Sequence, residues 1–250
     1  MRDRFGREIT YLRLSVTDLC NLRCRYCMPE EGVCKKDHGE MLTEDEMLLA
    51  VGAAASLGIT KLRITGGEPL VKKNILSICR RAAQVPGIRE LGMTTNGTLL
   101  PDLAVPLREA GVRRVNISLD TLDPEKYAQI TRTGRLTEAL AGIRAALEAG
   151  FDRVKLNAVL MGGFNDDEIE ALASLTLRHP IDVRFIELMP MGAGAFGREA
   201  YLPCTEVLRR LPALEPAAEE GGTGEAVPPA RGPGERGGNQ PRERPLLRRL

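Results

Sequence analysis

The sequence predicts an α/β fold built on a parallel β-sheet. Six short segments rich in Val, Ile, Leu and Thr alternate with segments in which apolar residues recur at helical spacing. Six successive strand–helix units favour a parallel sheet with right-handed crossovers. Such a sheet either closes as a barrel or stays open as a doubly wound sheet. The expected strands are residues 11–16, 61–65, 91–95, 114–119, 153–160 and 183–188.

The expected helices carry their own boundary signals. Thr43 should cap the first long helix, because Glu46 three residues later completes a capping box. Gly58 follows the helical pattern and should end that helix. The same reasoning predicts a stop at Gly150 and caps at Asp123, with Pro124 in the first helical position, and at Asn165.

Composition divides the chain into residues 1–214, expected to form one domain, and residues 215–250. Thirteen of the 35 residues from Pro216 to Leu250 are Gly or Pro, and none is aromatic. A segment with so few large apolar side chains cannot bury a core, so we predict a disordered, low-complexity tail. Its richness in Ala, Gly, Pro and Arg also suggests the hypothesis that the tail is an out-of-frame translation of GC-rich DNA.

Charge and hydropathy exclude several classes of protein. The 35 Lys and Arg residues nearly balance the 34 Asp and Glu residues, which leaves a net charge of +1. No global field therefore draws the chain to nucleic acid or to an anionic membrane. The sequence has no run of about twenty apolar residues, and its first residues lack a signal-peptide pattern. We expect a cytoplasmic protein that binds neither nucleic acid nor membrane.

Four of the six cysteines lie between Cys20 and Cys34. In a reducing compartment, clustered thiols favour a metal or redox site over disulfides. Cys20, Cys24 and Cys27 have the spacing C-x3-C-x2-C, and thiolates bind iron–sulfur clusters, zinc or Cu(I). One interpretation is a 4Fe-4S cluster with one iron left free, and the alternative is structural zinc with Cys34 as the fourth ligand. The remaining cysteines are expected to be ordinary core or surface thiols: Cys79 and Cys204.

Two arginines lie on otherwise apolar predicted strands. Arg13 and Arg63 would be costly to leave unpaired there, so an anion should lie near them. A polyphosphate would meet that need through charge-assisted hydrogen bonds. Polar residues also recur where the predicted strands end, and in a barrel those ends converge on one mouth.

Two motifs carry a family resemblance. The segment "CNLRCRYC" resembles the C-x3-C-x-aromatic-C signature of the radical S-adenosylmethionine (SAM) enzymes, and "RITGGEPL" resembles their GGEP segment. The resemblance implies that Cys20, Cys24 and Cys27 hold one 4Fe-4S cluster as metal ligands, and that the free iron binds SAM. Tyr26 matches the aromatic residue that lines the adenine end of SAM.

Further segments, "TTNG", "RRVNISLDTLDP", "NAVLMGGFND" and "VRFIELMPMG", resemble the GTP 3',8-cyclases, also called molybdenum cofactor biosynthesis protein A. This resemblance implies an incomplete (β/α)6 TIM-like barrel. It also implies a lyase that converts GTP to 3',8-cyclo-7,8-dihydro-GTP through a 5'-deoxyadenosyl radical. The residues implied to contact SAM are Tyr26, Gly66, Gly67, Glu68, Ser118 and Met189. Those implied to bind GTP are Arg13, Arg63, Thr94 and Lys155, of which Arg13, Arg63 and Lys155 are the catalytic candidates.

The sequence departs from the family pattern beyond the barrel. The family carries three more cysteines there for a second 4Fe-4S cluster, whereas no cysteine follows Cys204. A second cluster is not expected on this chain, and we expect cleavage of SAM without efficient cyclisation of GTP. The alternatives are a radical SAM enzyme with a different substrate and an inactive truncated fragment. The expected partners are GTP, an electron donor, the next enzyme of the pterin pathway and a second copy in a homodimer.

Overall fold

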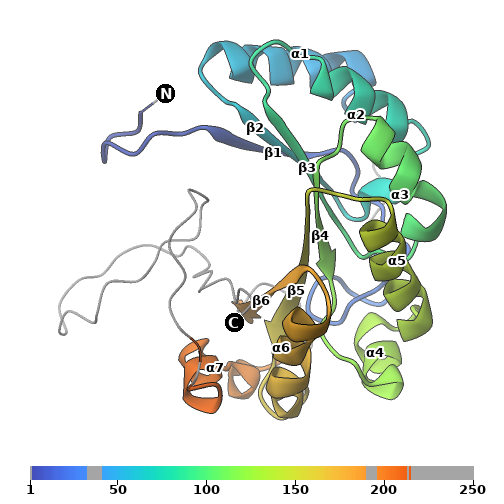
Figure 1. Cartoon of the computed structure of the whole chain (residues 1–250), viewed down its shortest axis with the longest axis vertical. Coiled ribbons are helices and arrows are strands. Elements are labelled where there is room, and N and C mark those ends of the chain that lie inside the picture. The colour runs from blue at the N-terminus through green and yellow to red at the C-terminus, as the bar shows by residue number, and fades with distance from the viewer. Residues whose placement is uncertain (1, 33–40, 190–195, 213, 215–250) are drawn as a thin grey trace.

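The computed structural model describes residues 2–32, 41–189, 196–212 and 214. Its centre is a six-stranded parallel sheet in which the strands follow one another in chain order (Figure 1). The strands are β1 Tyr11–Ser15, β2 Lys61–Thr65, β3 Glu90–Thr95, β4 Arg114–Ser118, β5 Arg153–Leu160 and β6 Ile181–Glu187. The α-helices are α1 Glu44–Ser56, α2 Ile75–Ala83, α3 Leu100–Glu109, α4 Pro124–Thr131, α5 Leu136–Glu148, α6 Ile169–Arg178 and α7 Thr205–Arg210. Three short 3-10 helices complete the set: η2 Pro69–Val71, η3 Asp166–Glu168 and η4 Arg198–Ala200.

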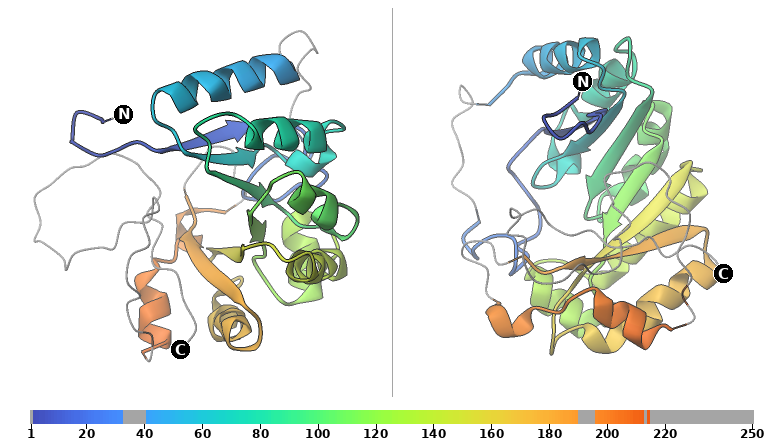
Figure 2. Two further views of the ribbon diagram at one scale, coloured as in Figure 1. Left: turned by 45° about the horizontal axis from the view of Figure 1, so that its top comes forward. Right: turned by 90° about the vertical axis from the view of Figure 1, so that its left-hand side faces the viewer.

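The sheet is curved, and helices α1 to α6 lie along its outer face (Figures 1 and 2). Among the described strands, β1 and β6 are edges with one neighbour each, so the sheet does not close. With the helices on one side, the arrangement is an incomplete (β/α)6 barrel rather than a doubly wound sheet. The fold class expected from the sequence is confirmed. We call the inner side of the sheet, opposite the helices, the concave face.

Strict alternation along each strand separates the core from the concave face. On β2, Leu62 and Ile64 are buried and belong to the main hydrophobic core, whereas Arg63 between them points the other way. The same alternation holds on β5, where Val154 and Leu156 are buried apolar residues. The outward residues pack under the helices, so the concave face is left for polar chemistry.

Most helix signals act as expected. Thr43 and Glu46 form the reciprocal capping box of α1, and Asp123 caps α4 through the amides of Glu125 and Lys126. Gly58 and Gly150 follow their helices with positive φ angles of 97° and 70°, the left-handed conformation that glycine adopts without a steric penalty.

The prediction for Asn165 is wrong. Its side chain makes no capping bond, and α6 begins only after the intervening turn η3. The Asn165 side chain is fully buried and instead donates from Nδ2 to the carbonyl oxygens of Asp120 and Val159, at 2.7 and 2.8 Å. Its Oδ1 accepts from the amide of Met161 at 2.8 Å. Asn165 therefore connects the carboxyl ends of β4 and β5. Buried backbone groups there need hydrogen-bond partners, and the Asn165 side chain supplies them instead of capping the helix.

The predicted boundary between residues 1–214 and the tail at 215–250 stays a prediction, because the tail lies outside the described residues. Cys34 lies outside them as well. None of the described helices is both long enough and apolar enough to cross a membrane. Cys79 and Cys204 are both buried, which confirms the prediction that they are ordinary protein thiols, here in the core.

Candidate functional site

The three spaced cysteines follow the carboxyl end of β1, on a segment that we call the cysteine loop (residues 17–32). This loop contains no helix or strand. The amides of Cys27 and Met28 both donate to the carbonyl oxygen of Cys24, at 2.9 and 3.0 Å. This turn brings the backbone of Cys27 close to that of Cys24, and Cys20 lies four residues earlier in the same loop.

The chemistry of the three thiols fits a cationic cluster. Burial raises the pKa of Cys24 above the ordinary value for a thiol, and the charge of Asp120, followed by those of the neighbouring thiolates, raises it further. Burial also raises the pKa of Cys20, whereas Cys27 is the exposed thiol of the three. Bound iron would offset this cost, because a metal cation stabilises the coordinated thiolate.

A zinc ion and a four-iron cluster make different demands on the thiols. Tetrahedral zinc takes four ligands in a structural site. A four-iron cluster binds each cysteine through a different iron, so three cysteines leave one iron open. Cys20, Cys24 and Cys27 supply three thiols on one loop, which matches the second case.

The glycine pair after β2 lies directly against the cysteine loop. Gly67 donates its amide to the carbonyl oxygen of Thr17 at 2.7 Å, and the amide of Glu68 donates to that of Leu19 at 2.7 Å. A Cβ atom at Gly66 would lie 2.5 Å from the Thr17 oxygen, and one at Gly67 would lie 2.4 Å from the Leu19 oxygen. No side chain fits there, so both glycines are required by the approach of the loop itself.

Glu68 joins three segments of the site. Its buried carboxylate accepts from the Thr95 hydroxyl and the Asn96 amide, both at 2.7 Å, and from the Leu70 amide at 3.0 Å. Burial raises the pKa of Glu68, and these three donors oppose that shift. The carboxylate thus fixes the end of β3 relative to the glycine pair. Asn96 in turn donates from Nδ2 to Asn21 Oδ1 of the cysteine loop at 2.8 Å.

Tyr26 connects the cysteine loop to the end of β4. Its hydroxyl donates to Asp120 Oδ2 at 2.8 Å, and Asp120 Oδ1 accepts from the amide of Val159 at 2.8 Å. Burial raises the pKa of Asp120 to about 6. Ser118 lies two residues before Asp120, at the carboxyl end of β4, and Met189 follows β6 with 42% of its surface exposed. The candidate SAM contacts therefore gather at the carboxyl edge of the sheet.

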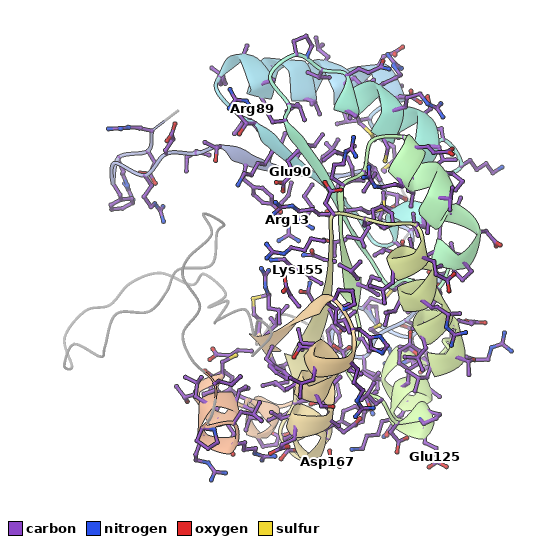
Figure 3. All side chains as sticks on the ribbon, in the orientation of Figure 1. Arg13, Arg89, Glu90, Glu125, Lys155 and Asp167 are labelled. Atoms are coloured by element: carbon purple, nitrogen blue, oxygen red, sulfur yellow. The ribbon has the colours of Figure 1, made fainter. Side chains whose placement is uncertain are left out.

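The remaining predicted residues share the concave face. Arg13 on β1 pairs in register with Arg63 on β2, and Thr94 on β3 lies two strands from Lys155, with Asn116 between them. Figure 3 shows Arg13 and Lys155 projecting to the side of the sheet that faces away from the helices. The sequence-predicted substrate residues are thus brought onto one surface.

Sequence reasoning missed several residues of that surface. Counted by strand alternation and register, the concave face carries seven cations and two carboxylates: Arg13, Lys61, Arg63, Arg114, Arg153, Lys155 and Arg184, with Glu90 and Asp182. Period-two spacing from Arg63 and Lys155 could have identified Lys61 and Arg153. Glu90 pairs with Arg114 at 3.2 Å and Asp182 with Arg153 at 2.8 Å, so both carboxylates of this face bind an arginine of the same face.

Lys155 is a buried lysine of the concave face, and its pKa reflects both its burial and the cations around it. It is 9% exposed, and Asp182 Oδ2 lies 3.9 Å from its Nζ. Burial lowers its pKa to about 8, and the charges of Arg184, Arg153 and Arg114 act in the same direction, while Asp182 opposes them.

The two arginines differ in their partners. Arg63 donates from Nε to the Tyr11 hydroxyl at 2.8 Å and from Nη1 to the carbonyl oxygen of Met93 at 3.3 Å, so it is partly satisfied within the fold. Gly92 beneath it leaves room for the guanidinium. Arg13 makes no hydrogen bond or ion pair with any residue that the structure describes. Arg13 is exposed, so water can solvate its guanidinium in the absence of a ligand. The prediction that an anion lies near these two arginines stays a prediction.

Two buried amides complete the concave face. Within the described part of the chain, the side-chain oxygens of Asn116 and Asn157 are buried and have no hydrogen-bond partner. Asn116 lies beside Lys155 in register, and Asn157 lies beside Ser118. Buried acceptors without a donor are costly. A ligand with hydroxyl groups would supply the missing donors at the same place where the cations require an anion.

Comparisons with known proteins agree with these features. The model of the radical SAM superfamily matches residues 14–176. The chain is 51% identical over 221 residues to the GTP 3',8-cyclase of Alkaliphilus oremlandii, covering 88% of this chain and 69% of that protein. It is 53% identical over 233 residues to the GTP 3',8-cyclase of Pelotomaculum thermopropionicum, covering 90% and 71%.

Solved structures share the fold at lower identity. Methylornithine synthase superposes with a TM-score of 0.65 at 16% identity, over 80% of this chain and 60% of that chain. A radical SAM methyltransferase from Sphaerobacter thermophilus superposes with a TM-score of 0.63 at 23% identity, over 80% and 62%. The motifs, the partial barrel and the close relatives lead to one assignment. The chain belongs to the GTP 3',8-cyclase family of the radical SAM superfamily.

Proposed function

We propose that this chain binds one 4Fe-4S cluster, SAM and GTP, and that its reaction is the family's conversion of GTP to 3',8-cyclo-7,8-dihydro-GTP in molybdenum cofactor biosynthesis. The observation that carries the proposal is that one sheet bears both surfaces. The cysteine loop follows the carboxyl end of β1, and the concave face of the same sheet carries seven cations, two carboxylates and the two side-chain oxygens without a hydrogen-bond partner. A polyanionic nucleotide with ribose hydroxyls matches both features of the concave face.

Different groups of residues would have different roles in this reaction. Cys20, Cys24 and Cys27 would hold the cluster, which leaves one iron for the amino and carboxylate groups of SAM. When bound, the cluster and SAM would supply a 5'-deoxyadenosyl radical that abstracts hydrogen from C3' of the GTP ribose. The other proposed SAM contacts are Tyr26, Gly66, Gly67, Glu68, Ser118 and Met189, of which the glycines and Glu68 act by fixing the loop against β2 and β3.

The cations would orient the substrate. Arg13, Arg63 and Lys155 would bind the triphosphate, with Thr94 beside them, and hold the ribose next to the SAM site. A bound anion would also oppose the burial and the arginine charges that lower the pKa of Lys155, so binding should raise that pKa above about 8. Orientation and exclusion of water are what the protein must add to the chemistry of its cofactors.

We predict that GTP binds the cluster-free chain about 100-fold more tightly than guanosine does. The reason is that two or more charge-assisted hydrogen bonds to the triphosphate are worth about 1.5–3 kcal/mol each. Isothermal titration calorimetry of both ligands measures the ratio. In Arg13→Gln the ratio should fall about tenfold, while Arg108→Gln, on α3 and paired with Asp152, serves as the control. Equal affinity for GTP and guanosine would contradict the proposed role of the concave face.

The second candidate function is a radical SAM enzyme with another substrate. The chain spans about 70% of the length of the relatives above. Cleavage of SAM that is stimulated by a peptide but not by GTP would favour it.

Further partners belong to the same proposal. A low-potential electron donor must reduce the cluster, and the cyclised nucleotide must pass to an enzyme that completes the pterin. A homodimer and a cytoplasmic location are proposed on the family resemblance and the need for reduced thiols.

A further inference from the structure

One residue at the end of α4 has an unusual backbone. Among the described residues other than glycine, Arg132 alone has a positive φ angle, at 63°. This conformation is unfavourable for a residue with a Cβ atom, and glycine would adopt it without penalty. Retaining arginine at a strained position indicates that its side chain does something that glycine cannot.

The Arg132 side chain reaches into the cysteine loop. Its Nη1 donates to the carbonyl oxygen of Arg23 at 2.7 Å and to that of Met28 at 3.2 Å. These two carbonyl groups bracket Cys24 and Cys27. One guanidinium thus holds both ends of the turn that presents two of the three thiols.

The residues around Arg132 contact the same loop. The carbonyl oxygens of Ile130 and Thr131 accept from the amides of Arg25 and Arg23, at 2.9 and 3.0 Å. Carbonyl groups in the last turn of a helix lack partners within the helix, so the loop satisfies them.

The two residues that follow Arg132 also approach the cysteine loop. The Thr133 hydroxyl donates to the carbonyl oxygen of Asn21 at 3.1 Å. A Cβ atom at Gly134 would lie 2.8 Å from the side chain of Leu22, so glycine leaves the space that the loop fills. Residues 130–134 therefore form a continuous support for the cysteine loop.

We propose that Arg132 is a positioning residue that sets the cysteine loop in its cluster-binding conformation before the cluster is present and slows loss of the cluster afterwards. The inference rests on the proposed assignment of Cys20, Cys24 and Cys27 as cluster ligands. Apart from the turn at Cys24, the loop has no helix or strand of its own, so contacts from outside the loop help to set its shape. A preformed loop binds its cluster without first losing conformational freedom.

Arg132→Gly tests this role, because it removes the guanidinium and also relieves the backbone. Hydrogen exchange of the cluster-free protein should show the amides of residues 21–28 exchanging about tenfold faster than in the wild type. In protein reconstituted with iron and sulfide, release of iron to a chelator should be about five- to tenfold faster. The melting temperature should stay equal or rise, since glycine fits the backbone. Arg132→Lys should recover part of the iron retention.

Two further variants make the test specific. Arg135→Gln removes a nearby arginine whose described partner is Glu138, outside the loop, and should behave as the wild type. Gly134→Ala leaves the arginine intact but displaces Leu22, and should also speed iron release.

Unchanged exchange and unchanged iron release in Arg132→Gly would overturn the inference, and so would iron loss accompanied by an equal loss of global stability. If the wild-type chain takes up no cluster, but Arg132→Gly still speeds amide exchange in the cysteine loop, the proposed function is rejected. The role of Arg132 in positioning the loop then stands.

Discussion

Replacing Cys24 by serine should remove the cluster and, with it, formation of 5'-deoxyadenosine. Cys24 is the most strongly shielded of the three thiols, its carbonyl group anchors the turn to Cys27, and Arg132 holds the loop on either side of it. A serine hydroxyl is a poor ligand for iron in place of thiolate. After anaerobic reconstitution, bound iron should fall from about four atoms per chain towards none, and deoxyadenosine should fall below detection.

Cys79→Ala is the matched control for this variant. Cys79 is a fully buried thiol on α2, outside the cysteine loop. Its removal should cost about 1 kcal/mol of stability, as for other small core truncations, and leave iron content unchanged. Full iron content in Cys24→Ser, or an equal loss of iron in Cys79→Ala, would contradict the assignment.

Lys155→Met should weaken GTP binding while stabilising the unliganded protein. The ammonium is buried among Arg114, Arg153 and Arg184, with Asp182 as its opposing charge, and its pKa is lowered from 10.5 to about 8. One pKa unit corresponds to about 1.4 kcal/mol, so the charged lysine costs on the order of 3–4 kcal/mol at neutral pH. Methionine fills a similar volume without that cost, and Asp182 keeps Arg153 at 2.8 Å.

The sign of this effect can be checked by pH. Between about pH 8 and 10.5 the unfolded chain binds more protons at this lysine than the folded chain does, so wild-type stability should gain a favourable contribution as pH rises through that window. The contribution should be missing in Lys155→Met. Denaturant unfolding at pH 7 and pH 10 measures it, with Lys126→Met as a control, since Lys126 pairs with Asp167 at the surface. A destabilised Lys155→Met at pH 7 would contradict the account of the concave face.

Much of the fold could be predicted because its signals are local. Period-two alternation on Lys61–Thr65 and a reciprocal capping box at Thr43 depend on neighbouring residues, and both appear as expected. The proposed cluster ligands carry a signal of the same local kind, because it consists of the spacing of three cysteines within one loop.

The roles that could not be predicted from the sequence depend on contacts between segments that are far apart in the chain. Asn165 matches a helix cap in sequence, yet the unpaired backbone groups of two strand ends take its side chain. Arg132 looks like a surface arginine after a helix, and only the approach of the cysteine loop, more than a hundred residues earlier, gives it a role. Neither pairing has a signature within a local window.

The most direct test of the central claim is to reconstitute the chain with iron and sulfide, add SAM and a strong reductant, and measure 5'-deoxyadenosine and cyclised nucleotide separately, with and without GTP. We predict deoxyadenosine at a rate that GTP raises several-fold. A chain that holds its cluster and produces no deoxyadenosine, with or without GTP, would contradict the account.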